Sequence, residues 1–172
     1  MAGGKKSYSG KNIVLIGMSG CGKSRIARIL AKKLKFDLVD VDSIIRSKYG
    51  NITDLFSKGE EYFRDIETKE VFLLEGKKDT VIATGGGCVT REENMHSLKK
   101  NGIIVYIKRS SKSIIETSNL SGRPLLAGGM DNVEKLFLKR RHLYDKYADL
   151  KVTNEGDISL VIGEILTKLR RY

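Results

Sequence analysis

The sequence predicts an α/β fold with three layers, in which helices cover both faces of a five-stranded parallel sheet. Short aliphatic segments alternate along the chain with longer segments whose apolar residues recur at helical spacing. The aliphatic segments are continuous rather than alternating, which is typical of strands buried on both faces. Strands separated by helices are joined by βαβ crossovers, and such crossovers produce a parallel sheet.

Each element is predicted from its local pattern. The predicted strands span residues 12–16, 37–41, 80–84, 103–107 and 150–153. The predicted helices span residues 23–35, 44–49, 53–56, 60–75, 111–117, 132–147 and 158–170, and a further helix runs to Lys100. Thr90 and Glu93 have the spacing of a capping box for that further helix, and Gly102 is placed to end it. The expected core-facing residues of two helices are Phe63, Ile66, Leu73 and Leu74, and Ile158, Val161, Ile162, Ile165 and Leu169.

Length and composition predict one globular domain. The chain has 172 residues, of which 40% are hydrophobic and 31% charged. We expect residues 1–11 to form a disordered basic tail and residues 12–172 to form the domain. No apolar run approaches the roughly 18 residues of a membrane helix, and residues 1–11 lack the apolar core of a secretory signal. Cys21 and Cys88 are too few for a disulfide framework, so we expect reduced thiols in a cytoplasmic protein.

The chain carries a net charge of +11, from 32 basic and 21 acidic residues. Such a charge is compatible with binding to nucleic-acid phosphates. It is equally compatible with scattered surface lysines around a site for small anions. Lys and Arg are spread along the whole chain, and no basic cluster flanked by aromatic residues is present. We therefore expect no nucleic-acid partner.

A phosphate-binding motif joins the first strand to the first helix. Residues 17–24 read GMSGCGKS, a full match to G-x-x-x-x-G-K-[S/T]. Glycines let backbone N–H groups turn toward an anion, and the helix N-terminus adds partial positive charge. Lys23 is expected to reach the β- and γ-phosphates and Ser24 to bind Mg²⁺. The predicted ATP-binding set is Gly17, Gly20, Cys21, Gly22, Lys23, Ser24 and Arg25.

Two acids close the second predicted strand. Asp40 and Asp42 are two residues apart, so on a strand both carboxylates would point toward the cleft at its carboxyl end. One acid near Mg²⁺ and one that accepts a hydroxyl proton are the groups that phosphoryl transfer to an alcohol needs. The alternative is a solvated strand end in which Asp42 caps the next helix. The neighbouring phosphate-binding motif favours the functional interpretation.

Three further features suggest a ligand site but are weak when taken alone. Arg64 and Glu67 are three residues apart on one helix face. This spacing fits a guanidinium that Glu67 holds ready for a ligand carboxylate, and it also fits an ordinary surface salt bridge. Gly85, Gly86 and Gly87 would let backbone approach a ligand, or form a loose turn. The long irregular stretch around Arg123 is typical either of a lid or of a disordered loop. In a lid, the arginine could reach the phosphates when the lid closes.

Taken in order and spacing, these motifs resemble the shikimate kinase family. The set is GMSGCGKS, DVD, FRDIE, GGG, RPLL and RRHLY, and it covers nearly the whole chain, from about residue 12 to residue 169. The resemblance implies a P-loop NTPase fold with a substrate-binding insertion near residues 42–75 and a lid near residues 117–131. It also implies a monomeric enzyme of aromatic amino-acid biosynthesis that uses ATP and Mg²⁺ to phosphorylate the 3-hydroxyl of shikimate.

The resemblance also implies roles for individual residues. Asp42 would be the base, Lys23 and Arg123 would act on the phosphates, and Ser24 and Asp40 would hold Mg²⁺. The implied shikimate-binding set is Asp42, Phe56, Phe63, Arg64, Gly85, Gly86, Gly87 and Arg140. Arg123 would also bind ATP, Glu67 would orient Arg64, and the R-x-x-L-Y spacing favours Arg140 over its neighbour Arg141.

The chain departs from the family pattern at two places near the adenine. Glu116 stands where members often carry an arginine, and residues 154–156 read NEG where a basic residue is common. These departures leave nucleotide affinity and base preference open, and with them a nucleotide-binding regulator without turnover. A related small-molecule kinase, such as a gluconate kinase, is the other alternative because it shares the P-loop and the sheet. Two arginines that converge on one pocket argue against the related kinase, and the intact Lys23, Ser24 and Asp42 argue against the regulator.

Overall fold

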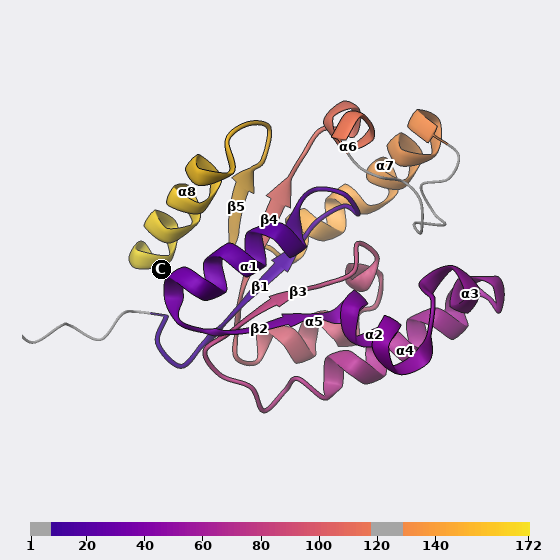
Figure 1. Cartoon of the computed structure of the whole chain (residues 1–172), viewed down its shortest axis with the longest axis horizontal. Coiled ribbons are helices and arrows are strands. Elements are labelled where there is room, and N and C mark those ends of the chain that lie inside the picture. Colours follow the sequence, from indigo (N-terminus) through magenta and orange to yellow (C-terminus); the bar gives the residue numbers. More distant parts are fainter. Residues whose placement is uncertain (1–7, 118–128) are drawn as a thin grey trace, which may run out of the picture.

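Five parallel strands form the centre of the fold in the order β2-β3-β1-β4-β5 (Figure 1). The structure is a computed structural model and describes residues 8–117 and 129–172. The strands are β1 (Asn12–Ile16), β2 (Asp37–Asp40), β3 (Thr80–Ala83), β4 (Gly102–Lys108) and β5 (Leu150–Thr153). The predicted α/β fold with a five-stranded parallel sheet is confirmed. The strand order reverses at β1, so the carboxyl end of β1 is the place where such sheets bind ligands.

Helices cover both faces of the sheet (Figure 1). One face carries α1 (Lys23–Leu34), which packs on β2 and β3, and α8 (Ile158–Arg171), which packs on β5 and α1. The other face carries α5 (Glu92–Lys99) and α7 (Gly129–Tyr147), which both pack on β4. Right-handed crossovers explain this division. From β1 the chain moves across the sheet toward β2, whereas from β3 it moves in the opposite direction toward β4, so the connecting helices lie on opposite faces.

The strands are buried as their aliphatic pattern predicts. Every residue of β1 is buried, and so are the first six residues of β4. Burial on both faces explains why neither strand alternates polar and apolar residues. The register pairs Leu15 of β1 with Ala83 of β3 and with Val105 of β4, so the three central strands end close to one another. Loops that follow these strands therefore meet at one edge of the sheet.

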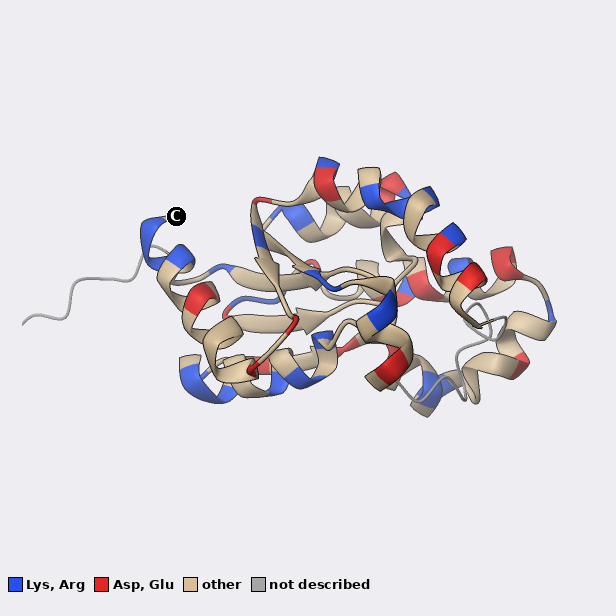
Figure 2. Cartoon of the chain, turned by 90° about the horizontal axis from the view of Figure 1, so that it is seen from above, with Lys and Arg blue, Asp and Glu red and all other residues tan. Residues whose placement is uncertain are grey.

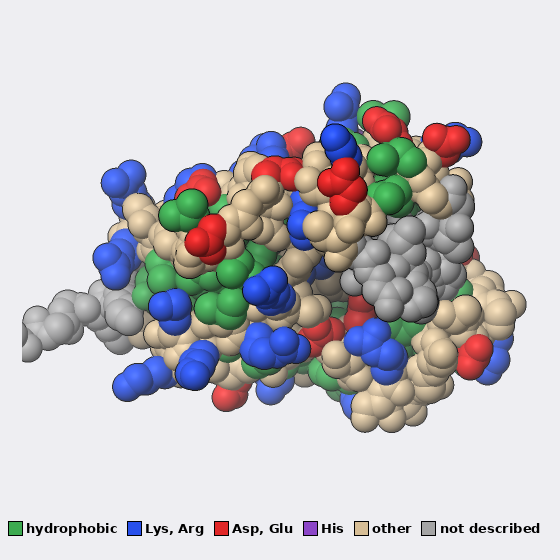
Figure 3. Space-filling view, turned by 45° about the horizontal axis from the view of Figure 1, so that its top comes forward, with side chains coloured by type: hydrophobic (Ala, Val, Ile, Leu, Met, Phe, Trp, Pro, Cys, Tyr) green, Lys and Arg blue, Asp and Glu red, His purple; other side chains and the backbone are tan. Residues whose placement is uncertain are grey.

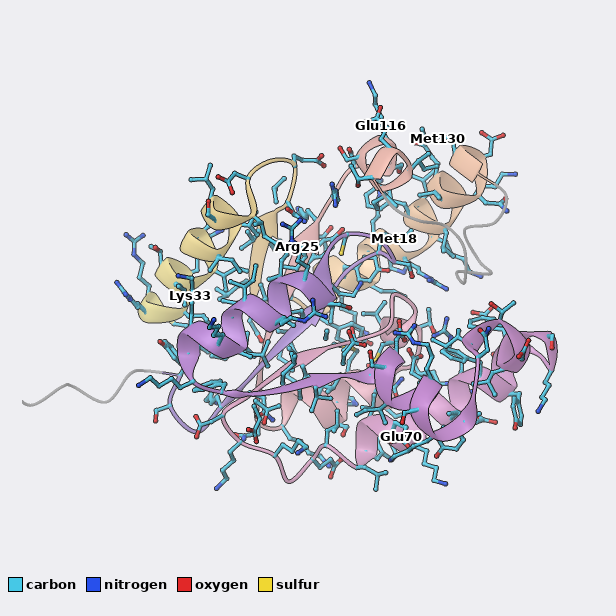
Figure 4. All side chains as sticks on the ribbon, viewed as in Figure 1. Met18, Arg25, Lys33, Glu70, Glu116 and Met130 are labelled. Carbon is cyan, nitrogen blue, oxygen red and sulfur yellow. The ribbon has the colours of Figure 1, made fainter. Side chains whose placement is uncertain are left out.

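Three helices lie between β2 and β3, in the stretch that the family resemblance assigns to substrate binding. They are α2 (Val41–Tyr49), α3 (Ile52–Ser57) and α4 (Glu60–Phe72). Buried Glu70 joins α4 to α2, because Lys48 and Tyr49 both donate hydrogen bonds to its carboxylate, of 2.7 and 2.8 Å. Figure 4 shows Glu70 among the packed helices below the sheet. The domain boundaries that we predicted stay predictions, since none of these contacts defines them.

Several predicted boundaries are wrong. Strand β2 ends at Asp40 and α2 begins at once with Val41, because the Asp40 carboxylate caps α2 by accepting from the Ser43 N–H at 3.0 Å. The predicted capping box is absent, since the Thr90 hydroxyl donates to the Gly87 carbonyl within the short helix η1 (Cys88–Thr90). Helix α5 begins at Glu92 without a side-chain cap.

Three more expectations at helix ends need correction. Gly102 opens β4 instead of ending the preceding helix. Helix α4 ends at Phe72, so Leu73 lies past its last turn with 62% of its surface exposed, whereas Leu74 is buried as expected. Ile158 is only partly buried because it is the first residue of α8, and the rest of its predicted stripe is buried. Helix ends obey local capping more than hydrophobic spacing, and this explains the errors.

Charged residues are spread over the outer surface. Figure 2 shows Lys, Arg, Asp and Glu mainly on the outer helices. On the face drawn in Figure 3, basic side chains are scattered and acidic ones lie among them. This face therefore has no single basic track of the kind that follows a nucleic-acid backbone. Within residues 8–117 and 129–172, no helix combines the length and the apolarity that crossing a membrane requires.

Candidate active site

The phosphate-binding motif lies where the sequence predicts it, between β1 and α1. Gly22 is the N-cap of α1 and has a φ of 100°, a conformation that glycine adopts without strain. The N–H of Cys21 donates to the carbonyl of Met18 at 3.2 Å and closes the loop into a turn. The first N–H groups of α1 are consequently free to face an anion at the carboxyl edge of the sheet.

Lys23 is buried inside this loop. Its ammonium group donates to the carbonyl oxygens of Gly17 at 2.7 Å and Met18 at 2.8 Å. These two acceptors hold a positive charge at the centre of the loop without neutralising it. An ammonium fixed in this way is placed for a phosphate that binds to the loop N–H groups.

A residue that sequence analysis did not identify holds the loop from outside. The buried side-chain amide of Asn154, which follows β5, donates to the carbonyl of Cys21 at 2.8 Å. Gly22 must be small here, because a Cβ at this position would lie 2.6 Å from Asn154 Nδ2. The sequence of residues 154–156 suggests a departure from the family pattern near the adenine. The structure gives Asn154 a role in shaping the phosphate loop. Only a tertiary contact between residues 133 positions apart reveals it.

The next residue, Glu155, ties the segment that follows β5 to the N-terminal end of helix α6 (Ser111–Thr117). Its carboxylate accepts from the backbone N–H of Ser110 and from the hydroxyl of Ser113, the latter at 2.5 Å. Although partial burial raises the pKa of Glu155, these hydrogen bonds bring it below the usual value. Glu155 therefore holds the N-terminal end of the helix that precedes the predicted lid.

The lid arginine, Arg123, lies outside the described residues, and so does most of the predicted lid. Glu116 of α6 and Met130 of α7 flank this segment (Figure 4). The Glu116 side chain is exposed and lies 3.9 Å from Lys112. Arg25, in the first turn of α1, is exposed to solvent near the phosphate loop.

The two acids of the DVD motif lie on different elements. Asp40 ends β2, whereas Asp42 belongs to the first turn of α2, so the strand alternation used to pair them does not apply. They are nevertheless close enough for the Asp40 charge to raise the pKa of Asp42. Burial is the largest cause of that raised pKa, and it outweighs the opposing influence of Lys23. Asp42 is thus a carboxylate with increased basicity that faces the phosphate loop.

The space beside Ser24 and Asp40 is open. A pocket of about 440 Å³ between α1 and α2 includes both residues in its wall. Among the described residues, no group of three or more His, Cys, Asp or Glu side chains could hold a metal ion. A hydroxyl and one nearby carboxylate fit Mg²⁺, which is bound through few protein ligands with waters and nucleotide phosphates completing its shell.

A second set of charges lies in the insertion, in a buried position. Arg64 Nη1 lies 2.5 Å from Glu67 Oε2, and both side chains are almost fully buried. The pair is therefore not the surface salt bridge that sequence analysis left open. Burial raises the pKa of Glu67. Burial by itself would lower the pKa of Arg64, but the charges of Glu67 and Glu60 outweigh this effect and raise it.

Arg140 of α7 joins this set of buried charges, where its guanidinium lies 3.7 Å from Glu60. It is buried, whereas its neighbour Arg141 is exposed, and burial together with the Arg64 charge lowers its pKa. The Nε atoms of Arg64 and Arg140 have no hydrogen-bond partner, and neither does Glu67 Oε1. Buried polar atoms without partners are uncommon, so these three atoms make the space around them a candidate place for a polar ligand.

The glycine triplet forms the floor between the two charged groups. A Cβ on Gly86 would lie 2.5 Å from Ser19 Oγ, and one on Gly87 would overlap the guanidinium of Arg64. The hydroxyl of Tyr144, four residues after Arg140 on the same helix face, donates to the Gly86 carbonyl at 2.6 Å. Only residues without a side chain allow the strand end to pass between the phosphate loop and Arg64.

An aromatic pair lines the outer wall of the pocket. The rings of Phe56 and Phe63 stack with centroids 4.4 Å apart. The guanidinium of Arg64 lies over both rings, 5.7 and 5.2 Å from their centroids. The aromatic pair excludes water on one side of the arginine and limits the fork to one orientation.

Comparisons with known proteins show which family this chain resembles. A family model described as shikimate kinase matches residues 19–170. A shikimate kinase of Thermodesulfovibrio yellowstonii is 46% identical over 163 residues, 92% of this chain and 94% of that protein. One of Clostridium botulinum is 42% identical over 154 residues, 89% of this chain and 93% of that protein.

Solved structures give the same result. A shikimate kinase from Acinetobacter baumannii, in complex with shikimate, superposes with a TM-score of 0.87 at 33% identity and covers 92% of both chains. A gluconokinase from Sinorhizobium meliloti reaches a TM-score of 0.66 at 16% identity, over 95% of this chain and 93% of that one. The second likeness concerns the fold alone.

Proposed function

Because the chain belongs to the shikimate kinase family, we propose that the site at the carboxyl edge of its sheet transfers the γ-phosphoryl group of ATP to the 3-hydroxyl of shikimate. The products are shikimate 3-phosphate and ADP. One observation carries the residue assignments: Asp42 lies within reach of the charge of Lys23 in the phosphate loop and of the charge of Arg64 in the insertion. Arg64 and Arg140 are both buried, and their Nε atoms have no hydrogen-bond partner. The site therefore has a place for a carboxylated ring between an anion pocket and a triphosphate.

The phosphate loop would hold ATP. Backbone N–H groups of residues 17–24 would bind the phosphates, with Lys23 Nζ moving from the carbonyls of Gly17 and Met18 to the β- and γ-oxygens. Ser24 and Asp40 would hold Mg²⁺, which neutralises the charge that develops on the phosphates. Arg25 and Arg123 are proposed to add contacts to ATP, with Arg123 brought in by the lid.

The insertion would hold shikimate. Arg64 and Arg140 would bind its carboxylate, with Glu67 keeping Arg64 in place. The Phe56–Phe63 pair would pack against the ring, and the backbone of Gly85, Gly86 and Gly87 would contact its hydroxyl groups. This arrangement explains the close passage of the glycine triplet between Arg64 and the phosphate loop.

Asp42 would act as the general base. It would accept the proton of the 3-hydroxyl while that oxygen forms a bond to the γ-phosphorus and the bond from the γ-phosphorus to the bridging oxygen breaks. Burial makes Asp42 a stronger base than an exposed aspartate, because it disfavours the charged form. A closed lid would exclude water, which would otherwise compete as the acceptor.

Release of ADP from Mg²⁺–ATP by the purified protein tests this function. It is measured with shikimate, with gluconate and without an acceptor. We expect strong stimulation by shikimate alone. Stimulation by gluconate would favour the related kinase, and ATP binding without any stimulation would favour a regulator without turnover. The monomeric state and the cytoplasmic location remain predictions, which light scattering and cell fractionation can check.

A further inference from the structure

Glu60, the first residue of α4, occupies the space between the two buried arginines of the pocket. Its Oε1 lies 3.3 Å from Arg64 Nη2 and 3.7 Å from Arg140 Nη2. One carboxylate oxygen therefore approaches two guanidinium groups that come from different helices. This is the arrangement that a bound substrate carboxylate would have in the same pocket.

The exposure of the three side chains differs. Both arginines are 4% exposed, whereas the Glu60 side chain is 47% exposed. Glu60 thus reaches into the pocket from its rim and is not locked in it. Glu67 already supplies Arg64 with a permanent buried partner, so the fold does not need Glu60 to neutralise that charge.

The local backbone allows Glu60 to leave. Gly59 precedes it with a φ of 121°, a Cβ there would meet no atom within 4 Å, and no side chain caps this end of α4. A glutamate in the first turn of a helix is also stabilised by the helix dipole when it points to solvent. Both the inward and the outward position of the carboxylate are therefore favourable.

We infer that Glu60 is a built-in competitor for the substrate carboxylate: it holds Arg64 and Arg140 in place in the empty pocket, and shikimate must displace it. This inference rests on the proposed function, since it needs shikimate to bind at the two arginines. A small anion that makes no other contact would have to compete with the Glu60 carboxylate, which the protein itself holds beside the two arginines. Shikimate gains further contacts from its ring and hydroxyl groups, so it can still bind after the cost of displacing Glu60, whereas a simple carboxylate retains little affinity.

The variant Glu60→Gln tests the inference, with Glu61→Gln as the matched control. Glu61 is the next residue, 88% exposed, and pairs with Arg91 instead of the pocket arginines. Titration calorimetry without nucleotide measures shikimate binding, and benzoate serves as the simple carboxylate. Glu60→Gln should bind shikimate about fivefold more tightly, the scale of one partly exposed ion pair, and benzoate by a similar factor. Glu61→Gln should match the wild type both in these affinities and in kcat.

The opposite results are equally clear. Weaker shikimate binding by Glu60→Gln would mean that Glu60 supports the arginines in the complex, and unchanged binding would mean that it competes with nothing. Either would overturn the inference. If the wild type binds no shikimate, the proposed function fails instead. Should Glu60→Gln melt at a lower temperature than the wild type, Glu60→Asp restores the charge on a shorter side chain and should bind shikimate with an affinity between the two.

Discussion

The side-chain amide of Asn154 lies 2.8 Å from the carbonyl oxygen of Cys21 and donates a hydrogen bond to it. This bond joins the segment after the last strand to the phosphate loop after the first strand, and both groups are buried. The next residue, Glu155, binds the start of α6. Two adjacent side chains thus connect the phosphate loop with the helix that leads to the predicted lid.

Asn154→Ala should weaken ATP binding more than it weakens the fold. Loss of one buried hydrogen bond costs about 1 kcal/mol of unfolding free energy, and the freed Cys21 carbonyl allows the loop to change shape. We expect a raised KM for ATP, an unchanged KM for shikimate and a small decrease of the melting temperature. Thr153→Ala, at the exposed neighbouring position, is the control. An unchanged KM for ATP would show that Asn154 has a purely structural role.

Asp42→Asn should remove the base but leave the ATP site intact. Loss of a positioned general base lowers turnover by ~10² or more. The rate of phosphoryl transfer and the affinity for a nonhydrolysable ATP analogue measure the two effects separately. Asp54→Asn, on the exposed side of α3, is the matched control. Turnover close to that of the wild type would remove Asp42 from the base role.

The same substitution should stabilise the protein in a pH-dependent way. Burial raises the pKa of Asp42 in the folded protein, so the folded state binds this proton more tightly than the unfolded state. The ionised carboxylate therefore costs stability, and this cost appears as the pH rises from the unfolded pKa, about 3.9, through the raised folded pKa. Asp42→Asn should melt at a higher temperature than the wild type at pH 7, with a gain that shrinks toward pH 3.5. A difference in melting temperature that stays constant from pH 3.5 to pH 7 would contradict this prediction.

Arg64 should contribute mainly to substrate affinity. Arg64→Ala should weaken shikimate binding by about 2–5 kcal/mol if the arginine pairs with a desolvated carboxylate. Because Ala would leave buried Glu67 without its partner, Arg64→Lys is measured beside it. Lysine keeps the charge but loses the two-pronged geometry, so binding should weaken while the fold is retained. Arg46→Ala, exposed on α2, is the control, and an unchanged shikimate affinity in Arg64→Lys would argue against the carboxylate contact.

Much of the site was predictable because its parts follow strand ends. The loop 17–24, the DVD acids and the glycine triplet each come directly after a strand, and parallel strands bring their carboxyl ends to one edge. The spacing between Arg64 and Glu67 indicated a pair on one helix face. It could not indicate burial, since the same spacing occurs on helix surfaces, and burial separates a pocket from a surface salt bridge.

Sequence by itself determined the order of the elements, the phosphate loop and the resemblance to shikimate kinases, because each depends on residues that are close together in the chain. Tertiary structure decided the rest. It showed that Asp40 caps α2 while Asp42 is partly buried with a raised pKa, that Asn154 holds Cys21, and that Glu60 lies between Arg64 and Arg140. Each of these depends on side chains from separate elements, whose distances and burial are set only when the helices pack on the sheet.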